Sequence, residues 1–448
     1  MRIEMPEKVK YILSVIQAAG FESYAVGGCV RDSLLGREPN DWDITTSAKP
    51  EQVKELFRRT IDTGIQHGTV TVMLEREGFE VTTYRIDGEY EDSRHPKEVI
   101  FTASLEEDLK RRDFTINAMA YNEEEGLIDI FGGMDDIQKK IIRCVGNAKE
   151  RFSEDALRML RAVRFAAQLG YTIEDNTKTA ITELAPTLQK ISAERIQVEL
   201  VKLVISDHPD MLRVAYETGI TAVILPEFDR CMETKQHNPH HCYSVGEHTL
   251  HSMLETKPDK ILRLAMLFHD MGKPLTISTD AEGIDHFKGH AKKSEEICHT
   301  VLRRLKFDND TLYTVSKLVF YHDYFIQETE KSMRRAMYKI GTELMESLFA
   351  VKRADFMAQS DFQRQEKEQN LEMLRDIFHQ VLDKNQCVSL KELAVTGKDL
   401  MAAGMQPGKT LGSVLQEMLQ DVLEIPEHNK KEYLLQNLSK YIERADLK

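Results

Sequence analysis

The sequence predicts a small α/β head followed by an all-α remainder, and three observations lead to this fold class. Short apolar segments with alternating side chains crowd the first third of the chain. Two of them, 68–74 and 79–84, flank a turn over residues 75–78 and predict an antiparallel hairpin. From about Ile137 onward, long amphipathic stretches with few β-branched clusters predict helices almost exclusively. We therefore expect a small mixed sheet in the head and helices in the neck, body and tail.

Length and composition restrict the class of protein. A chain of 448 residues corresponds to about three domains of ordinary size and can bury sizeable cores. Its charged N-terminus and the lack of a membrane-spanning apolar run indicate neither export nor membrane insertion, so we expect a cytoplasmic protein. The six cysteines include no Cys-x-x-Cys pair, which favours reduced, mostly structural thiols. No segment points to a protein partner.

The net charge of −14 argues against a protein that coats nucleic acid indiscriminately, because phosphate binding needs local positive potential. Any contact with RNA must therefore use local basic surfaces. Candidates are Lys110–Arg112, the arginines that follow residue 157, and lysines in the C-terminal third. For the lysines, a solvated face is an equally good explanation.

The glycine turn at Gly27–Gly28 and the two aspartates after it form the most informative local pattern. Tyr24–Val26 has the composition of a strand end, and the glycines let backbone N–H groups approach a phosphate. Strand alternation would place Asp41 and Asp43 on one face, with Trp42 on the other. Two such carboxylates can hold Mg²⁺, which also binds substrate phosphates. Each half of the pattern alone would also fit an ordinary surface turn.

Two further features belong beside this site. Glu80, in the second strand of the predicted hairpin, could supply a third carboxylate, although exposure on the hairpin would also explain it. The polar segment Asp87–Pro96 ends in a helix-disfavouring proline and predicts a mobile loop next to the site.

The segment 110–120 reads Lys-Arg-Arg-Asp-Phe-Thr-Ile-Asn-Ala-Met-Ala. Its paired arginines, Arg111 and Arg112, can neutralise a triphosphate. Asp113 and Asn117 are four residues apart, so on a helix they would share one face and could hold sugar or loop groups. A helix start with flanking charges is the alternative explanation.

The segment 153–170 predicts one helix, with Ser153 as its N-cap and Gly170 as its stop. Asp155 and Arg158 would be neighbours on one face, where one offers acceptors and the other donors. Cytosine and adenine both present an amino donor beside a ring acceptor, whereas uracil and guanine present the reverse order. This pair could therefore accept CTP and ATP and refuse UTP and GTP.

The same helix continues with a stripe of positive charge. Arg161 and Arg164 follow Arg158 at three-residue spacing and suit the phosphates of a triphosphate. Glu154 and Asp155 could instead merely complement the helix dipole. The later segment Ser192–Leu200 opens as a capping box would, and we interpret it as a brace for the nucleotide-binding helix.

Histidines form a second constellation, because ten of the fifteen fall between His237 and His322. The candidate metal ligands are His248, His269, Asp270, His290, His322 and Asp355. Imidazoles and carboxylates from successive helices suit a divalent transition metal such as Mn, Ni, Co or Fe, and two ions could activate water against a phosphoester. The set follows the order seen in the HD phosphohydrolase superfamily, which it resembles. A scaffold that keeps the ligands without hydrolysing anything is the alternative.

Together, the motifs resemble the class II tRNA nucleotidyltransferases, which comprise the CCA-adding enzymes and their poly(A) polymerase relatives. The resemblance rests on Gly27–Gly28 with Asp41 and Asp43, on 110–120 and on 153–165, and it covers nearly the whole chain. It implies that C, C and A are added to the 3′ end of tRNA from CTP and ATP, without a nucleic-acid template. It also associates the 87–96 loop with addition of the terminal A, and Asp155 with Arg158 as a substitute for a template.

The resemblance also assigns roles to named positions. Catalysis falls to Asp41 and Asp43, which would hold Mg²⁺, with Glu80 of the hairpin as a candidate third catalytic carboxylate. Nucleotide binding falls to Gly27, Gly28, Arg31, Asp32, Arg112, Asp113, Asn117, Asp155, Arg158, Arg161 and Arg164. The expected domains are a head over 1–140, a neck over 141–205, a body with the HD residues over 206–360, and a tRNA-binding tail over 361–448. Glycine- and lysine-containing turns between 393 and 412 suit RNA phosphates in that tail.

Three alternative functions stay open at this level. A poly(A) polymerase or an enzyme adding only A is a close relative, although the segment 61–69 favours CCA addition. The HD residues could form the main active site, a phosphohydrolase with a nucleotide-sensing head; the intact Asp41 and Asp43 argue against it. A non-enzymatic tRNA-binding role would require both metal sites to be idle.

Overall fold

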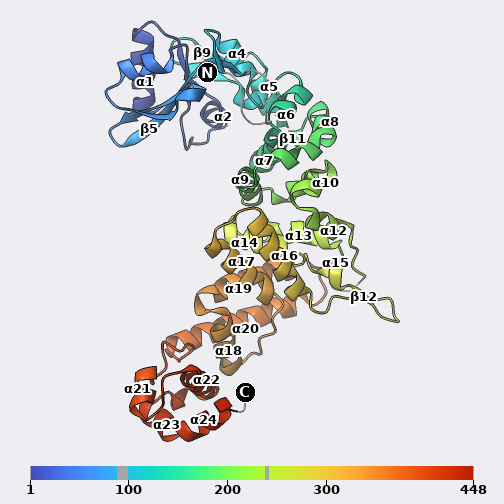
Figure 1. The fold of residues 1–448 in the computed structure, drawn as a ribbon. Helices are drawn as coiled ribbons and strands as arrows, with labels where there is room; N and C mark the ends of the chain where they lie inside the picture. The colour runs from blue at the N-terminus through green and yellow to red at the C-terminus, as the bar shows by residue number, and fades with distance from the viewer. Residues whose placement is uncertain (1, 88–98, 238–241, 447–448) are drawn as a thin grey trace. The chain divides into compact units, whose positions relative to one another are not determined.

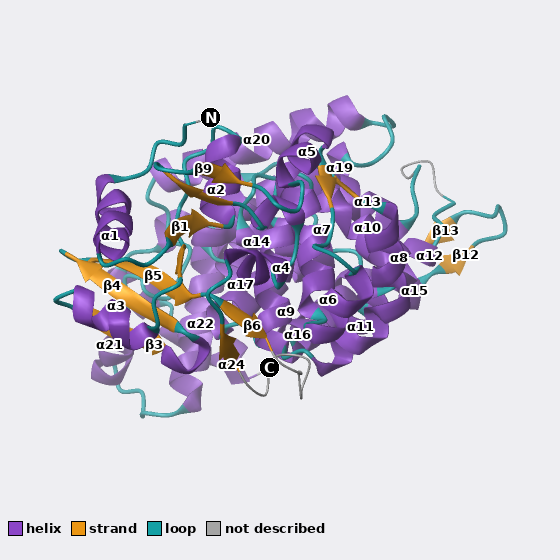
Figure 2. Cartoon of the chain, turned by 90° about the horizontal axis from the view of Figure 1, so that it is seen from above, coloured by secondary structure: helices purple, strands orange, loops and turns teal. Residues whose placement is uncertain are grey.

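The computed structural model describes residues 2–87, 99–237 and 242–446. The chain forms two compact units, one comprising 1–229 with 304–307 and the other 230–303 with 308–448 (Figure 1). Strands are concentrated in the first unit and helices make up most of the second, which confirms the predicted fold class. Figure 2 shows helices as the predominant element of the chain. The two units are a coarser division than the four predicted domains, whose boundaries stay a prediction.

A seven-stranded mixed sheet is the frame of the first unit. Its strand order is β3-β4-β5-β2-β1-β8-β9, and only β2 and β5 pair in parallel. The strands are β1 Ser23–Val26, β2 Ile44–Thr46, β3 Thr60–Gly64, β4 Thr69–Leu74, β5 Glu77–Thr83, β8 Ala120–Asn122 and β9 Gly126–Ile128. The pairing of β4 with β5 confirms the predicted hairpin. Strand β6 (Arg85–Asp87) pairs with β7 (Val99–Phe101), and residues 88–96 of the predicted loop lie outside the described residues.

Helices complete the first unit. Those of the head are α1 Glu7–Ala18, α2 Gly28–Leu34, α3 Pro50–Leu56, α4 Leu105–Lys110 and α5 Gly133–Lys139. Then follow α6 Ala148–Glu154, α7 Leu157–Leu169, α8 Asp175–Leu184, α9 Ala193–Val204, α10 Leu212–Glu217 and α11 Ile220–Ile224. Two short strands, β10 (Ile141–Ile142) and β11 (Thr172–Ile173), pair between them. Helix α12, Pro226–Glu233, contains the boundary between the two units. Leu109 of α4 is buried with Tyr24 and Val26 of β1, which fixes α4 on the sheet.

The expected helix over 153–170 is wrong in one respect: the structure has two helices. Helix α6 ends at Glu154 and α7 begins at Leu157, with Asp155 extended between them. Ser153 is therefore not a cap, and its hydroxyl donates to the Lys149 carbonyl within α6. The break has a physical reason, since the Asp155 carboxylate accepts a hydrogen bond from the Leu157 N–H and so serves the start of α7. Gly170 ends α7 with φ at 68°, as predicted.

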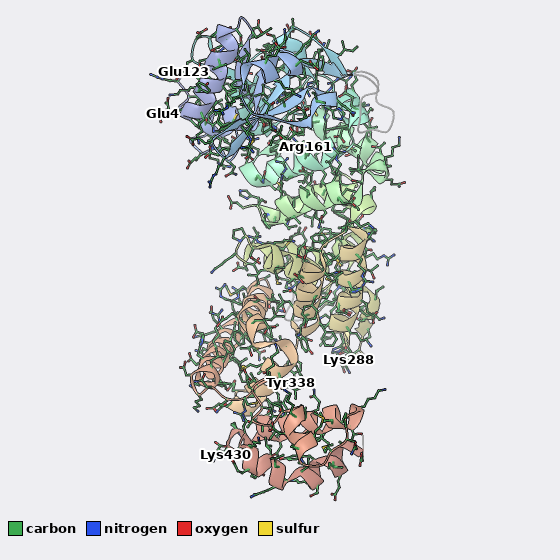
Figure 3. All side chains as sticks on the ribbon, turned by 60° about the vertical axis from the view of Figure 1, so that its left-hand side comes forward. Glu4, Glu123, Arg161, Lys288, Tyr338 and Lys430 are labelled. Carbon is green, nitrogen blue, oxygen red and sulfur yellow. The ribbon has the colours of Figure 1, made fainter. Side chains whose placement is uncertain are left out.

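The second unit is built from helices, with one small hairpin of β12 (Ser278–Thr279) and β13 (Asp285–His286). Its helices are α13 Val245–Leu254, α14 Lys260–Phe268, α15 Lys273–Thr276, α16 His290–Arg304, α17 Asn309–Tyr321, α18 Glu330–Ile340, α19 Met345–Met357, α20 Arg364–Asp383, α21 Gly397–Ala402, α22 Lys409–Glu424, α23 Lys431–Gln436 and α24 Leu438–Asp446. Helix α14 packs against α13, α17 and α19. Tyr338 of α18, labelled in Figure 3, donates to Gln416 of α22 at 2.6 Å and joins these two helices.

Two other expectations concern membranes and cysteines. Among the described residues, no helix is long and apolar enough to cross a membrane. All six cysteines are free thiols, as expected, and Cys242 is the exposed one.

Candidate active site and candidate metal centre

Three carboxylates meet at the centre of the head sheet. The parallel register of β2 and β5 pairs Ile44 with Val81, so the residues just before them, Asp43 and Glu80, come side by side. Asp41 and Asp43 are exposed and Trp42 is buried, which matches the predicted alternation although this stretch precedes the regular strand. All three carboxylates line one cleft of about 1,110 Å³. The structure therefore brings together the three predicted catalytic residues.

The charges of this cluster are only partly balanced, by Arg112. Within the described parts of the chain, the side chains of Asp41, Asp43 and Glu80 make no hydrogen bond or ion pair. Partial burial raises the pKa of Asp43, which Arg112 opposes and Asp41 reinforces. Partial burial, Asp43 and then Asp41 raise the pKa of Glu80. A divalent cation would stabilise these three carboxylates, because their like charges lie close together and none of them forms an ion pair with another described residue.

The glycine turn lies beside the carboxylates and faces Arg112. Gly27 has φ of 83°, a conformation that favours glycine, and an added Cβ would come 3.1 Å from the Arg112 guanidinium. The Val26 N–H donates to the Asp43 carbonyl at 3.0 Å, which fastens the turn to the aspartate segment. Asp108 of α4, fully buried, pairs with Arg112 at 3.4 Å and orients it.

A continuous network connects the turn to the helices after the sheet. Arg31 donates to Asn117 at 2.6 Å, and Asn117 donates to Asp113 at 3.2 Å. Arg161, labelled in Figure 3, then pairs with Asp113 at 2.6 Å. Asp113 and Asn117 were expected on an α-helix, but Asn117 ends a 3-10 helix over Thr115–Asn117 and Asp113 precedes it. The predicted contact between the two side chains nevertheless forms.

Two members of this network have environments set by the ion pairs. Burial alone would raise the pKa of Asp113, but the charge and hydrogen bonds of Arg161, with Asn117 and Arg158, hold it well below the usual range. Asp32, predicted among the nucleotide-binding residues, accepts two hydrogen bonds from its neighbour Arg31 at 2.8 and 2.9 Å. The carboxylate thus orients the arginine that reaches Asn117.

The positive stripe of α7 divides into an accessible and a buried part. Arg161 is one-third exposed, whereas Arg164 is buried, with its guanidinium 3.4 Å from the Phe165 ring centroid. Arg164 pairs with Glu199 of α9 at 2.8 Å. This environment favours Arg164 as a brace between α7 and α9 over the predicted contact with phosphates.

The predicted base-reading side chains are each held by a partner. Arg195 pairs with Asp155 at 2.6 Å, and Glu154 pairs with Arg158 at 2.6 Å. Arg158 also donates to the Arg111 carbonyl at 2.9 Å, which links α7 to the end of α4. Both functional groups are therefore oriented before any ligand arrives. Ser192 occupies the N-cap position of α9 but makes no side-chain capping bond, so the expected capping box is wrong.

Sequence reasoning interpreted 192–200 as a brace for the nucleotide-binding helix, but it did not identify which side chains hold the site residues in place. Asp108, Arg195 and Glu199 hold Arg112, Asp155 and Arg164, and Glu154 holds Arg158. Glu154 and Asp108 carried a signal, because each stands four residues before the arginine that it pairs with. The pairs of Arg195 with Asp155 and of Glu199 with Arg164 span 40 and 35 residues, and no local sequence pattern predicts them.

Comparisons with known proteins agree with this geometry. The Poly A polymerase head domain model matches residues 23–143, the probable RNA and SrmB-binding site of polymerase A matches 170–232, and the putative tRNA nucleotidyltransferase domain 2 matches 275–438. The CCA-adding enzyme of Enterococcus faecalis is 39% identical over 95% of this chain and 93% of its own length. The chain belongs to the CCA-adding enzyme family.

Other relatives give the same result. The CCA-adding enzyme of Levilactobacillus brevis is 36% identical over 96% of both chains. The crystal structure of the Bacillus stearothermophilus CCA-adding enzyme in complex with CTP is 30% identical, with a TM-score of 0.74 over 99% of this chain and all of that one. The Thermotoga maritima CCA-adding enzyme complexed with tRNA, at 18% identity and a TM-score of 0.59, shares the fold. CCA-adding enzymes are nucleotidyltransferases that depend on divalent metal ions.

In this member of the family, the second unit gathers the six predicted metal ligands. His248 lies on α13, His269 and Asp270 follow α14, His290 starts α16, His322 follows α17 and Asp355 lies on α19. The Nε2 atoms of His248 and His269 are 3.2 Å apart, and those of His290 and His322 are 3.1 Å apart. Asp270 belongs to both groups, since its two oxygens face the two histidine pairs. Asp355 Oδ1 lies 3.0 Å from His248 Nε2.

The four imidazoles are oriented as metal ligands are. Each Nδ1 lies 2.7–3.3 Å from a backbone carbonyl, of Ala358, Met266, Phe287 and Val319 in turn. A carbonyl accepts only, so Nδ1 carries the proton and the Nε2 lone pairs point inward. Burial lowers the pKa of His322 to about 3, which keeps that ring neutral. The buried Asp270 Oδ2 accepts no hydrogen bond of normal geometry within the described residues, although Lys273 Nζ is 2.7 Å away.

Proposed function

We propose that this chain completes the 3′ end of tRNA by adding C, C and A from CTP and ATP, with release of pyrophosphate. The observation that carries the proposal is the cluster of Asp41, Asp43 and Glu80 on a head of this family, next to the arginine-lined glycine turn. We also propose a cytoplasmic location, where tRNA and nucleoside triphosphates are found.

The carboxylates fit Mg²⁺. All three offer hard oxygen ligands, and within the described residues none is committed to a hydrogen bond or an ion pair. Asp41 and Asp43 would hold the ions, and Glu80 lines the same cleft. Bound there, Mg²⁺ would lower the pKa of the tRNA 3′ hydroxyl and neutralise the leaving pyrophosphate.

The remaining head residues would position the triphosphate. Arg112, held by Asp108 against Gly27, supplies positive charge beside the turn. Arg31 is largely engaged with Asp32 and Asn117, so its contribution is to fix the shape of the turn. Asp113 is engaged with Arg161 and Asn117 and would hold the nucleotide helix in place.

Asp155 and Arg158 would select the base. The Asp155 oxygens can accept from the amino group of cytosine or adenine, and Arg158 can donate to the adjacent ring nitrogen. UTP and GTP present a donor and an acceptor in the reverse order, and each mismatched buried partner costs about 1–3 kcal/mol. The ion pairs with Arg195 and Glu154 keep both side chains in one orientation, so no nucleic acid template is needed.

The test uses tRNA transcripts that end before CCA, after the first C and after CC. Labelled CTP and ATP, with Mg²⁺, should complete all three to CCA, and UTP or GTP should not be incorporated. Asp41→Ala should abolish addition, whereas Asp62→Ala, on β3 of the same sheet and paired with Lys54, should retain it. Long A tails would show a poly(A) polymerase, and A addition to the CC-ended transcript alone would show a partial enzyme.

A second candidate function belongs to the histidine centre. Six candidate ligands converge there with inward-facing Nε2 atoms, and Asp270 belongs to both ligand groups. A cleft of about 730 Å³ opens beside it and is lined by Lys352, Lys367 and the exposed Phe325. We propose metal-dependent phosphoester hydrolysis at this centre, by a transition metal such as Mn, Ni, Co or Fe.

Hydrolysis can be measured separately from nucleotide addition. Protein loaded with Mn²⁺, Ni²⁺ or Co²⁺ should release phosphate from p-nitrophenyl phosphate or open a 2′,3′-cyclic nucleotide. His290→Ala should remove this activity and leave CCA addition intact. Metal binding without hydrolysis of either probe would reduce the centre to a structural role.

A further inference from the structure

Arg37 occupies the part of the catalytic cleft that the nucleotide-binding residues do not line. The cleft is bounded by Asp41, Asp43 and Glu80, and also by Arg37, whereas its lining among the described residues includes neither Gly27 nor Arg112. Helix α2 separates the two regions, because the glycine turn precedes its first residue and Arg37 follows its last turn. Its seven residues span about 10 Å at 1.5 Å per residue.

The end of α2 fixes the backbone of Arg37. Gly36 has φ of 68°, its N–H donates to the Ser33 carbonyl at 3.1 Å, and the Arg37 N–H donates to the Asp32 carbonyl at 2.8 Å. This pair of bonds is a Schellman motif, which satisfies the last carbonyls of the helix. The side chain of Arg37 therefore starts from a fixed position at the cleft.

Among the described residues that line this cleft, Arg37 is the cation whose charge no carboxylate neutralises. Lys8 pairs with Glu75 at 2.8 Å and with Glu77 at 3.2 Å, and Arg2 lies 3.9 Å from Glu123. Arg37 donates a long hydrogen bond of 3.5 Å to the Gln168 carbonyl, which orients it without neutralising it. No carboxylate of the described residues lies within 4.0 Å of its guanidinium.

We infer that Arg37 binds the last phosphodiester of the RNA primer and so positions the attacking 3′ hydroxyl over Asp41 and Asp43. The inference rests on the proposed nucleotide addition. In-line attack requires the hydroxyl to approach the α-phosphorus from the side opposite the leaving pyrophosphate. The triphosphate lies by the glycine turn, so the primer backbone enters from the other side of the carboxylates, where Arg37 lies. A guanidinium suits a phosphate there because it binds two oxygens at once.

Steady-state kinetics of C addition to a tRNA primer that ends before CCA should distinguish an effect on primer binding from an effect on CTP binding. Arg37→Gln should raise KM for the primer roughly ten- to a hundredfold, the effect of losing a charged hydrogen bond, with KM for CTP unchanged. Arg37→Lys should recover part of the loss, because lysine keeps the positive charge but cannot bind two phosphate oxygens at once as the guanidinium does. Arg2→Gln is the matched control, since Arg2 lines the same cleft but is mostly exposed.

A primer with an uncharged methylphosphonate in its last linkage makes the test specific to that phosphate. The wild type should lose about as much activity on this primer as Arg37→Gln loses on the normal one, and Arg37→Gln should lose little more on it. If instead the two losses multiply, Arg37 does not contact that phosphate and the inference fails. A higher KM for CTP alone would also overturn it, by placing Arg37 on the nucleotide side. A wild type that adds no nucleotide would refute the proposed function and this inference together.

Discussion

The two candidate metal centres of this chain are built in opposite ways. In the head, Asp41 and Asp43 are exposed oxygen donors, and within the described residues they have no partner. In the histidine centre, His248, His269 and His322 are buried and each lies within 4.0 Å of the buried Asp270. The head therefore keeps its ligands open to solvent, whereas the second unit encloses them.

This difference indicates how each centre would use its metal. Open carboxylates suit an ion that arrives with a substrate triphosphate and leaves with pyrophosphate, as Mg²⁺ does. Enclosed imidazoles with fixed Nδ1 protons suit a resident transition metal. The two centres should also affect the free energy of unfolding differently. Unpaired like charges in the head destabilise the fold, whereas the enclosed ligands of the histidine centre destabilise it only when the metal is absent.

The largest expected effect comes from Asp43→Asn. The substitution removes one ligand charge, so C and A addition should fall on the order of a thousandfold. The free energy of unfolding should stay within about 0.5 kcal/mol of wild type or rise slightly, since the pKa of Asp43 is raised and its ionised form is disfavoured in the fold. Urea unfolding and single-nucleotide addition measure both effects. A strongly destabilised variant would show that Asp43 has a structural partner.

Asp270→Ala should have a comparably large effect on metal content and almost none on nucleotide addition. Asp270 is common to both ligand groups, so its loss should empty the histidine centre. Metal analysis after dialysis should give one or two ions per wild-type chain and none for the variant. CCA addition should stay within about twofold of wild type, because the two centres lie in separate compact units. Loss of both activities would contradict the proposed independence.

Metal binding should stabilise the second unit measurably. At a free concentration of 100 times its dissociation constant, a metal that binds only the folded centre adds about 2.7 kcal/mol. Thermal unfolding of the wild type with Mn²⁺ or Ni²⁺ should therefore shift upward, and unfolding of Asp270→Ala should not. The same shift in both proteins would place the stabilising ion elsewhere.

Much of the head centre was predictable from sequence, and the reasons are local. The spacing of Asp41 and Asp43 and the hairpin that carries Glu80 follow from strand alternation. The parallel pairing of β2 with β5, which brings Glu80 to Asp43, joins segments about 37 residues apart, and alternation does not specify it. The break between the two helices at Asp155 was not predicted, because it depends on the Asp155 side chain capping the following helix. Hydrophobic periodicity does not indicate such a cap. The partner of Arg164, Glu199, is 35 residues away, so the sequence does not indicate this ion pair.

The smallest expected effect is on the pH dependence of nucleotide addition. Partial burial and the charges of Asp43 and Asp41 raise the pKa of Glu80, so protons bind this cluster at a higher pH than they bind an isolated carboxyl. Only ionised carboxylates hold Mg²⁺, so activity should be full above the raised pKa values and fall as pH drops through them, with more than one proton taken up. Glu80→Gln removes one of these protons and should make the acid limb shallower, with a smaller loss of rate at neutral pH than Asp43→Asn. The measurement is kcat/KM for CTP from about pH 5 to 8, with Glu77→Gln, three residues earlier on β5 and paired with Lys8, as the control. An unchanged slope would place Glu80 outside the set of carboxylates that share the metal, and the head centre would then consist of Asp41 and Asp43 alone.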